Sequence, residues 1–271
     1  MRCAVLGDPI AHSLSPVLHR AGYAVLGLDW RYDAVRVPAG GLARFVAALG
    51  DEWRGLSVTM PLKREALELA ADASEVARAA GAANTLVRED ALWRADNTDV
   101  AGAVAALRER LPSPPVVATI LGGGATAAST ALALCELGVG SLTLLVRSPA
   151  RAAGTLEAID NHPARPGVRI GALATDPVVG ELVVSTIPAS AQDPDLVERC
   201  REVPAVFDVV YDPWPTPLAA SVADDRVLVG GLDLLVHQAA LQFTAFTGSP
   251  APLAEMRAAG ERALRQRGGG A

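Results

Sequence analysis

The stretch VVATILGGGATAAS, residues 116–129, decides how the rest of the sequence is interpreted. Its first part, residues 116–121, is a continuous apolar run typical of a central parallel strand that is covered on both faces. The run leads directly into three glycines and an alanine-rich helical segment that ends near Gly138. A second apolar run, SLTLLVR at residues 141–147, completes a strand–helix–strand unit. The sequence therefore predicts an α/β domain built on a parallel sheet.

The glycine-rich turn after the first strand has part of a dinucleotide-binding pattern. Gly122 and Gly124 supply G-x-G, and Ala127 occupies the third position, where a small residue is allowed. Glycines let the backbone approach a diphosphate, and the free N–H groups at the start of a helix attract the anion. A tight turn that serves packing alone is the alternative. The predicted cofactor-binding residues of this turn are Gly122, Gly123, Gly124, Ala125 and Thr126.

The end of the next strand distinguishes NADP from NAD. NAD sites place a carboxylate there, which accepts hydrogen bonds from the ribose 2′-hydroxyl. This sequence has Arg147 and Ser148 instead, with Arg151 one helical turn later. Guanidinium groups suit a 2′-phosphate, so we expect these three residues to bind NADP in preference to NAD. Solvated arginines at the start of a helix are the alternative.

Further strand-like runs indicate that the sheet continues. They are VRIGAL, ELVVSTIP, AVFDVVYD and VLVGG, at residues 168–173, 181–188, 205–212 and 227–231. Together they predict a Rossmann-like, doubly wound parallel sheet. Residues 3–60 also alternate between strand and helix patterns, which predicts a separate N-terminal α/β domain. Three prolines in LPSPP, residues 111–115, cannot continue a helix and mark a linker.

The helical segments after Gly231 are expected to return to the first domain and pack on it. We therefore predict a two-domain α/β fold. Residues 1–100 and 232–271 would form an N-terminal substrate-binding domain, and residues 101–231 would form an NADP-binding domain.

The composition limits the classes of partner. The chain of 271 residues is 51% hydrophobic and 20% charged, as globular domains are. A net charge of −6, with scattered arginines and 4% aromatic residues, argues against nucleic acid and favours a small molecule. No apolar run is long enough for a membrane span, and the histidines lack metal-ligand spacing, so neither a membrane nor a metal is expected. Three widely spaced cysteines favour the reducing cytoplasm over a disulfide framework.

Lys63 is the only lysine among 24 lysine and arginine residues. Arginine stays protonated at physiological pH, whereas a lysine in a suitable environment can donate and accept a proton. Lys63 is therefore the first candidate for acid–base chemistry. A solvated lysine at a helix start is the alternative.

Five further segments carry polar residues that plain α/β packing would not need. They are GDPIAHSLSP, LSVTMPLK, GAANTL, DNTD and GLDLLVHQAA, at residues 7–16, 56–63, 81–86, 96–99 and 231–240. With the glycine turn, these segments resemble the shikimate dehydrogenase family, in order and over essentially the whole chain. The resemblance implies an oxidoreductase that reversibly reduces 3-dehydroshikimate to shikimate with NADPH, in chorismate and aromatic amino acid biosynthesis.

The resemblance also implies roles for individual residues. Lys63 matches the catalytic lysine of the family, which takes or supplies the proton of the reacting hydroxyl or stabilises the alkoxide. Asp99 matches its partner, with a plain helix N-cap as the alternative. Ser13 and Ser15 match a pair of hydroxyls that binds the substrate carboxylate, and helix capping by Ser15 is the alternative. The other matched residues are Thr59, Asn84, Tyr211 and Gln238 for the substrate, and Val209 and Gly231 for the cofactor.

Strand-end and turn chemistry is the alternative for Thr59 and Asn84. The sequence departs from the family pattern in the glycine turn, which lacks an arginine, at Val146 in place of asparagine, and at Asp233, where glycine is frequent. Other functions stay open: a quinate/shikimate or aminoshikimate-type dehydrogenase using NAD, or a catalytically silent ligand-sensing homologue. A methylenetetrahydrofolate dehydrogenase has a similar layout, but the paired serines and DNTD argue against it. The protein is expected to be a monomer or homodimer.

Overall fold

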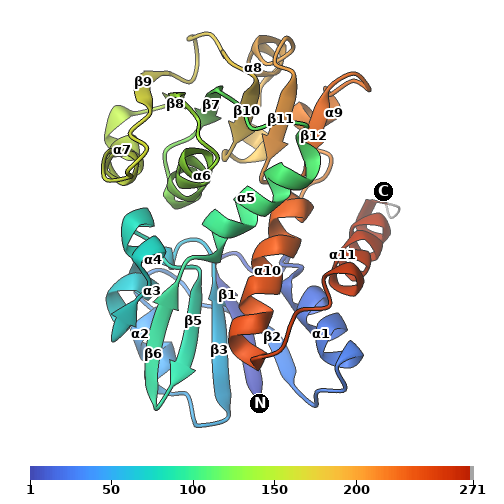
Figure 1. Ribbon diagram of the computed structural model, residues 1–271. Helices are drawn as coiled ribbons and strands as arrows, with labels where there is room; N and C mark the ends of the chain where they lie inside the picture. Colours follow the sequence, from blue (N-terminus) through green and yellow to red (C-terminus); the bar gives the residue numbers. More distant parts are fainter. Residues whose placement is uncertain (269–271) are drawn as a thin grey trace. The chain divides into compact units, whose positions relative to one another are not determined.

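The computed structural model describes residues 1–268, and the chain divides into two compact units (Figure 1). Unit 1 comprises Met1–Thr98 and Leu235–Ala271, of which residues 269–271 lie outside the described part, and unit 2 comprises Asp99–Leu234. We predicted boundaries after residues 100 and 231. The proline run at residues 111–115 is not the linker that we expected, because it lies inside unit 2, after α5 (Thr98–Arg110). Prolines end a helix within a domain as readily as between domains.

Unit 1 is built on a mixed sheet with the strand order β2-β1-β3-β5-β6-β4. The strands are β1 (Arg2–Gly7), β2 (Arg31–Arg36), β3 (Trp53–Val58), β4 (Asp72–Ala73), β5 (Thr85–Glu89) and β6 (Leu92–Asp96). β1 pairs in parallel with β2 and β3, whereas β5 is antiparallel to both β3 and β6. Asp90 and Ala91 alone connect β5 to β6, both at positive φ, and so short a turn joins antiparallel strands.

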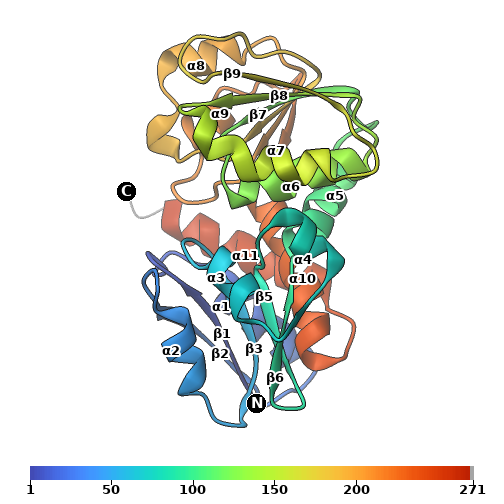
Figure 2. The ribbon, with the colours of Figure 1, turned by 90° about the vertical axis from the view of Figure 1, so that its left-hand side faces the viewer.

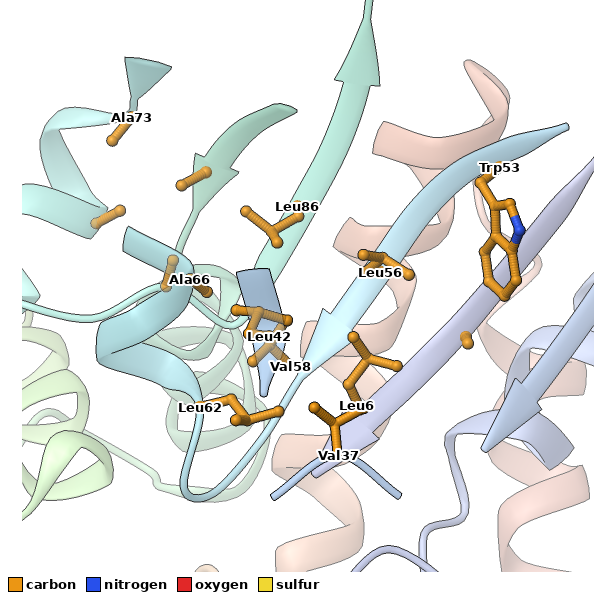
Figure 3. Packing of buried hydrophobic residues seen from close by; sticks show 14 residues of the cluster. Leu6, Val37, Leu42, Trp53, Leu56, Val58, Leu62, Ala66, Ala73 and Leu86 are labelled. Carbon is orange, nitrogen blue, oxygen red and sulfur yellow. The ribbon is translucent and has the colours of Figure 1, made fainter. Parts of the chain in front are cut away.

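Helices cover both faces of this sheet (Figures 1 and 2). They are α1 (Ser15–Val25), α2 (Leu42–Ala47), α3 (Lys63–Leu69), α4 (Glu75–Ala80), α10 (Gly231–Thr247) and α11 (Leu253–Gly268). On one face, Leu6, Leu56 and Leu86 of the sheet share a core with Leu42 of α2 and Leu62 before α3 (Figure 3). Each of these fully buried leucines stabilises the fold by about 1.5–3 kcal/mol.

The opposite face of the unit 1 sheet is covered by α1 and α10. Gly55 of β3 lies against the ring of Phe246 on α10, where an added Cβ would come within 2.2 Å of the ring. Gly22 of α1 lies similarly close to the ring of Phe243, which is also on α10. α11 packs against α1. The C-terminal helices therefore pack on the N-terminal domain, as predicted.

Unit 2 is built on a parallel sheet. Its strands are β7 (Val117–Leu121), β8 (Ser141–Val146), β9 (Gly167–Ala172), β10 (Leu182–Ser185), β11 (Ala205–Asp208) and β12 (Val227–Val229). They lie in the order β9-β8-β7-β10-β11-β12, and every pair is parallel. Numbered by their order in this unit, the strands run 3-2-1-4-5-6, which is the order of the Rossmann fold. The predicted Rossmann-like sheet is confirmed.

Helices cover both faces of the unit 2 sheet as well. They are α6 (Ala125–Glu136), α7 (Ala153–Asp160), α8 (Pro194–Arg199) and α9 (Pro217–Ala220), with short 3₁₀ turns η1 (Pro149–Ala152) and η2 (Ala189–Ala191), and α5 precedes the first strand of this unit. α6 and α7 pack side by side (Figure 2), and Leu196 of α8 and Leu218 of α9 share a core with Val183 and Val206 of the sheet. Within residues 1–268, no helix combines the length and the apolar character that crossing a membrane requires.

Candidate active site

Four loops of unit 1 meet at one edge of its sheet. β1, β3 and β6 end at this edge, and the antiparallel β5 begins there after Asn84. The backbone N–H of Thr59 donates to Leu6 O at 2.9 Å. That of Asn84 donates to Asp96 O at 3.1 Å. The polar segments that the sequence singled out in the first 99 residues are therefore gathered at one place by the topology of the sheet.

Ser13 and Ser15 follow β1 at this edge. Ser15 is buried at the first position of α1, but the N-cap residue is Leu14 and no side chain caps the helix. Helix capping by Ser15, which we considered as the alternative, does not occur. Ser13 Oγ accepts from Ser15 N at 3.3 Å, and within residues 1–268 no side chain or backbone group bonds to the hydroxyl of Ser15 or of Thr59. These two hydroxyls can therefore bind a ligand.

Lys63 is the first residue of α3 and is half-buried. Its carbonyl accepts from Ala83 N at 2.8 Å, which ties the start of α3 to the loop that carries Asn84. A cation at a helix N-terminus opposes the helix dipole, so helix stability does not explain a lysine there. The partial burial and the backbone tie distinguish Lys63 from the solvated helix-start lysine of the alternative interpretation.

Asn84 is buried, and hydrogen bonds fix the orientation of its side-chain amide. Its Oδ1 accepts from the backbone N–H of Thr98 at 2.8 Å, so its Nδ2 cannot occupy that position. Nδ2 donates to Thr98 Oγ1 at 3.0 Å and to Gln238 Oε1 at 3.3 Å. The structure thus brings together Asn84 and Gln238, which we predicted to bind one ligand. The bond to Thr98 N is also the turn role that we named as the alternative for Asn84.

Asp99 is the first residue of unit 2 and directly follows Thr98, the last residue of the first segment of unit 1. It is buried in the first turn of α5, which begins at Thr98. The N-cap role that we named as the alternative for Asp99 does not apply, because Asp99 lies inside the helix. An acid in the first turn is favoured by the helix dipole, and its carboxylate can serve a ligand as well.

The three glycines of the turn after β7 differ in how closely other atoms surround them. Gly122 has a φ of +112°, and an added Cβ would lie 2.4 Å from Thr186 Oγ1. A Cβ on Gly123 would lie 3.0 Å from Ala152 Cα. Gly124 is different: its backbone is extended, and no described atom lies within 4 Å of an added Cβ. Packing therefore explains two of the glycines, whereas the open space beside Gly124 is compatible with a ligand that approaches the backbone.

The start of α6 fits the diphosphate of a dinucleotide. α6 begins at Ala125 after Gly124, and no side chain caps it. The N–H groups of Ala125 and Thr126, in its first turn, have no acceptor within the helix, and they attract an anion. Gly122 N donates to Leu145 O at 2.9 Å, which holds the turn beside the end of β8.

Arg147 and Arg151 follow β8 at the same edge of the unit 2 sheet. Arg147 comes directly after the strand, and Arg151 lies in η1. Both are exposed, and neither forms an ion pair with any described residue. Ser148, between them, is half-buried. Two guanidinium groups without acidic neighbours can bind a phosphate bidentately.

Val209 directly follows β11, and Gly231, which comes after β12, lies against it. A Cβ on Gly231 would come within 2.5 Å of Val209 O. The segment after β11 is held by buried Asp208, which accepts from Thr216 Oγ1 at 2.6 Å and from Gln192 Nε2 at 2.9 Å. Burial raises the pKa of the Asp208 carboxyl, and these donors oppose the shift. Tyr211 belongs to this segment and is half-buried.

Asp233, which departs from the family pattern, has a structural role within unit 2. Its Oδ2 accepts from Gly230 N at 3.0 Å, and its Oδ1 pairs with Arg110 Nη2 at 2.9 Å. The carboxylate therefore accepts a hydrogen bond at the start of α10 and links this helix to the end of α5.

Sequence reasoning missed four buried polar residues of unit 1. They are Ser57, Thr85, Thr98 and Gln242, and all bond to Asn84 or to one another. The spacing of Gln238 and Gln242 on α10, four residues apart, was the available signal, because such residues share one helix face. As to metals, nowhere in residues 1–268 do three His, Cys, Asp or Glu side chains gather so that they could hold an ion.

A Rossmann sheet with a glycine turn, in a chain whose other unit gathers a lysine and several hydroxyl and amide groups, defines a two-domain NAD(P)-dependent oxidoreductase. The family described as "Shikimate dehydrogenase substrate binding domain" matches residues 5–86, and "Shikimate 5'-dehydrogenase C-terminal domain" matches residues 231–259. The chain belongs to the shikimate dehydrogenase family.

Individual relatives agree over almost the full length. Shikimate dehydrogenase (NADP(+)) of Moorella thermoacetica is 36% identical, covering 97% of this chain and 92% of the relative. The crystal structure of Mycobacterium tuberculosis shikimate dehydrogenase has a TM-score of 0.85 at 40% identity, covering 97% of this chain and 99% of that one. Shikimate 5-dehydrogenase of Thermus thermophilus, in complex with NADP(H) and shikimate, has a TM-score of 0.80 at 30% identity, with coverage of 97% and 99%.

Proposed function

We propose that this protein catalyses the reversible, NADP-dependent reduction of 3-dehydroshikimate to shikimate, in the biosynthesis of aromatic amino acids. The observation that carries the proposal is the position of Lys63 on the sheet edge that also gathers Thr59 and Asn84. A polyol acid needs several donors and acceptors, because each of its buried polar groups left unpaired costs about 1–3 kcal/mol.

Unit 1 is proposed to bind the substrate. The hydroxyls of Ser13 and Ser15 would bind the carboxylate, and Ser15 Oγ has no other partner among the described residues. Thr59, Asn84 and Gln238 would bind the ring hydroxyls. Asp99 and Tyr211 would contribute to the same substrate, as the family resemblance implies.

Lys63 and Asp99 are proposed to assist the transfer of the proton of the reacting hydroxyl. NADP, when bound, accepts or supplies the hydride. Loss of hydride from the carbinol carbon requires loss of the proton from its oxygen, and the reverse reaction requires a proton donor there. Lys63 Nζ would accept that proton in the oxidation and return it in the reduction. Asp99 would orient the ammonium and the hydroxyl.

Unit 2 is proposed to bind NADP. Gly122, Gly123 and Gly124 with Ala125 and Thr126 would hold the diphosphate, because the open side of Gly124 and the start of α6 fit an anion. Arg147, Ser148 and Arg151 would bind the 2′-phosphate. Val209 and Gly231 would also contact the cofactor.

Replacing both Arg147 and Arg151 by alanine should lower kcat/KM for NADP⁺ by about 100-fold or more, because each lost charged hydrogen bond is worth about 1.5–3 kcal/mol. The value for NAD⁺, which has no 2′-phosphate, should stay nearly unchanged. Steady-state kinetics with each cofactor measures both. The control is Arg201→Ala, an exposed arginine of the same unit that pairs with Glu198. An equal loss of kcat/KM for the two cofactors would show that the two arginines do not bind the 2′-phosphate.

The substrate is tested by comparing kcat/KM for shikimate and quinate at saturating NADP⁺. We expect shikimate to be preferred. A preference for quinate would favour the quinate/shikimate alternative. Binding of shikimate without turnover would identify a ligand-sensing homologue.

The protein is further proposed to act in the cytoplasm as a monomer or homodimer. All three cysteines, Cys3, Cys135 and Cys200, are buried free thiols, which suits a reducing compartment.

A further inference from the structure

Gln242 lies one helical turn after Gln238 on α10 and is buried, with 1% of its surface exposed. Its Oε1 accepts from Ser57 Oγ at 2.6 Å. Its Nε2 donates to Asn84 O at 3.1 Å and to Thr85 Oγ1 at 3.0 Å. One side chain of the C-terminal helix thus bonds to two strands of the N-terminal sheet, β3 and β5, and to the residue before β5.

The directions of these hydrogen bonds are determined. Because Gln242 Nε2 donates to Thr85 Oγ1, the hydroxyl proton of Thr85 is free to point to Asn84 Oδ1, which lies 2.8 Å away. Asn84 Oδ1 is then an acceptor from two sides, since it also accepts from the backbone N–H of Thr98. Rotation of the Asn84 amide would place Nδ2 against the backbone N–H of Thr98 and would force the Thr85 hydroxyl to turn its proton away.

The hydrogen bonds on the other side of Gln242, through Ser57 and Tyr32, have fixed directions as well. Ser57 Oγ gives its proton to Gln242 and accepts from Tyr32 Oη at 2.5 Å. The Tyr32 ring stacks on His19, with 4.1 Å between ring centroids. Ser57 and Tyr32 are buried, so a broken link leaves a polar group without water to replace the lost partner.

We propose that Gln242 is a positioning residue for the substrate site, and that it acts through Thr85 and the backbone of Asn84 to hold the Asn84 amide. Its effect on the reaction rests on the proposed function, in which Asn84 and Gln238 bind the ring hydroxyls. Gln242 itself bonds to Asn84 through the backbone carbonyl and is not proposed to contact the substrate. The residue thereby supports, through the Thr85 hydroxyl, the orientation of the Asn84 amide that the backbone N–H of Thr98 also favours.

The test uses Gln242→Met, which keeps the length of the side chain and removes both hydrogen-bonding ends. The Kd of shikimate without cofactor, and its KM, should rise by about tenfold, the equivalent of one or two lost hydrogen bonds. The KM for NADP⁺, and kcat at saturating shikimate, should stay within about twofold, because the change affects binding alone. Ser57→Ala, which removes one partner of Gln242, should raise the Kd by a smaller factor.

Thr247→Val is the matched control, because the Thr247 hydroxyl lies on the same helix and donates to Phe243 O, outside the chain of hydrogen bonds. Melting temperatures separate folding from binding, and Ser57→Ala carries the test if Gln242→Met does not fold. A Kd for shikimate within about twofold of the wild-type value in the folded variants would overturn the inference, since a residue that serves packing lowers the melting temperature alone. Absence of shikimate binding by the wild-type protein would instead overturn the proposed function.

Discussion

We expect Lys63→Arg to lower kcat for shikimate oxidation by about 10³-fold, within the range that a positioned acid–base group contributes. The variant keeps the positive charge at the first residue of α3, but a guanidinium cannot give up its proton at physiological pH. KM for shikimate should change by a few-fold at most, because the substitution does not remove the hydroxyl and amide groups proposed to bind the ring. Steady-state kinetics with NADP⁺ measures both constants.

Arg64→Lys is the matched control for this prediction, because it introduces a lysine at the neighbouring, exposed position of α3. Its kinetics should equal those of the wild-type protein. If Lys63→Arg also turned over within a few-fold of the wild-type rate, Lys63 would be an electrostatic stabiliser or a surface lysine and not the proton donor.

His19→Phe removes an acid-sensitive contribution to stability. Burial lowers the pKa of the His19 imidazole from 6.5 to about 3; the Gln242 amide opposes this shift but makes no hydrogen bond with either ring nitrogen. In the unfolded chain the imidazole takes up a proton as the pH falls below 6.5, whereas in the folded protein it stays neutral until about pH 3. The contribution is therefore complete above pH 6.5 and is lost as the pH falls towards 3.

Between pH 7 and pH 4 this loss amounts to about 3 kcal/mol of unfolding free energy, at 1.36 kcal/mol for each pH unit of differential protonation. Urea unfolding at the two pH values should show that the wild-type protein loses about 3 kcal/mol more than His19→Phe does. The difference between pH values is the readout, so any change in packing at 19 cancels. His12→Gln, at an exposed histidine, is the control and should follow the wild type. Equal losses in wild type and His19→Phe would show that the imidazole is protonated in the folded state.

Local patterns in the sequence were sufficient to predict unit 2. The apolar run at residues 116–121 forms β7, and the glycines after it lead into α6, because both features depend on neighbouring residues alone. The proline run at residues 111–115 misled the prediction of the linker for the same reason. It shows where a helix stops, whereas a boundary between units depends on contacts between distant segments.

The candidate site was predictable only in part. Lys63 stood out as a lone lysine, and the family resemblance supplied Asn84 and Gln238. The bond from Gln238 to Asn84 joins residues far apart in the sequence, and no periodicity reveals it. Gln242 was missed because a glutamine on an apolar helix has no distinctive spacing beyond its relation to Gln238. What it does there depends on the register with which α10 packs on β3 and β5.

The measurement that tests the central claim most directly is kcat/KM for shikimate oxidation by the wild-type protein, with NADP⁺ and with NAD⁺, followed by the absorbance of the reduced cofactor. The account predicts turnover, with NADP⁺ preferred by at least about tenfold because of Arg147 and Arg151. Absence of turnover with either cofactor, or a preference for NAD⁺, would contradict it.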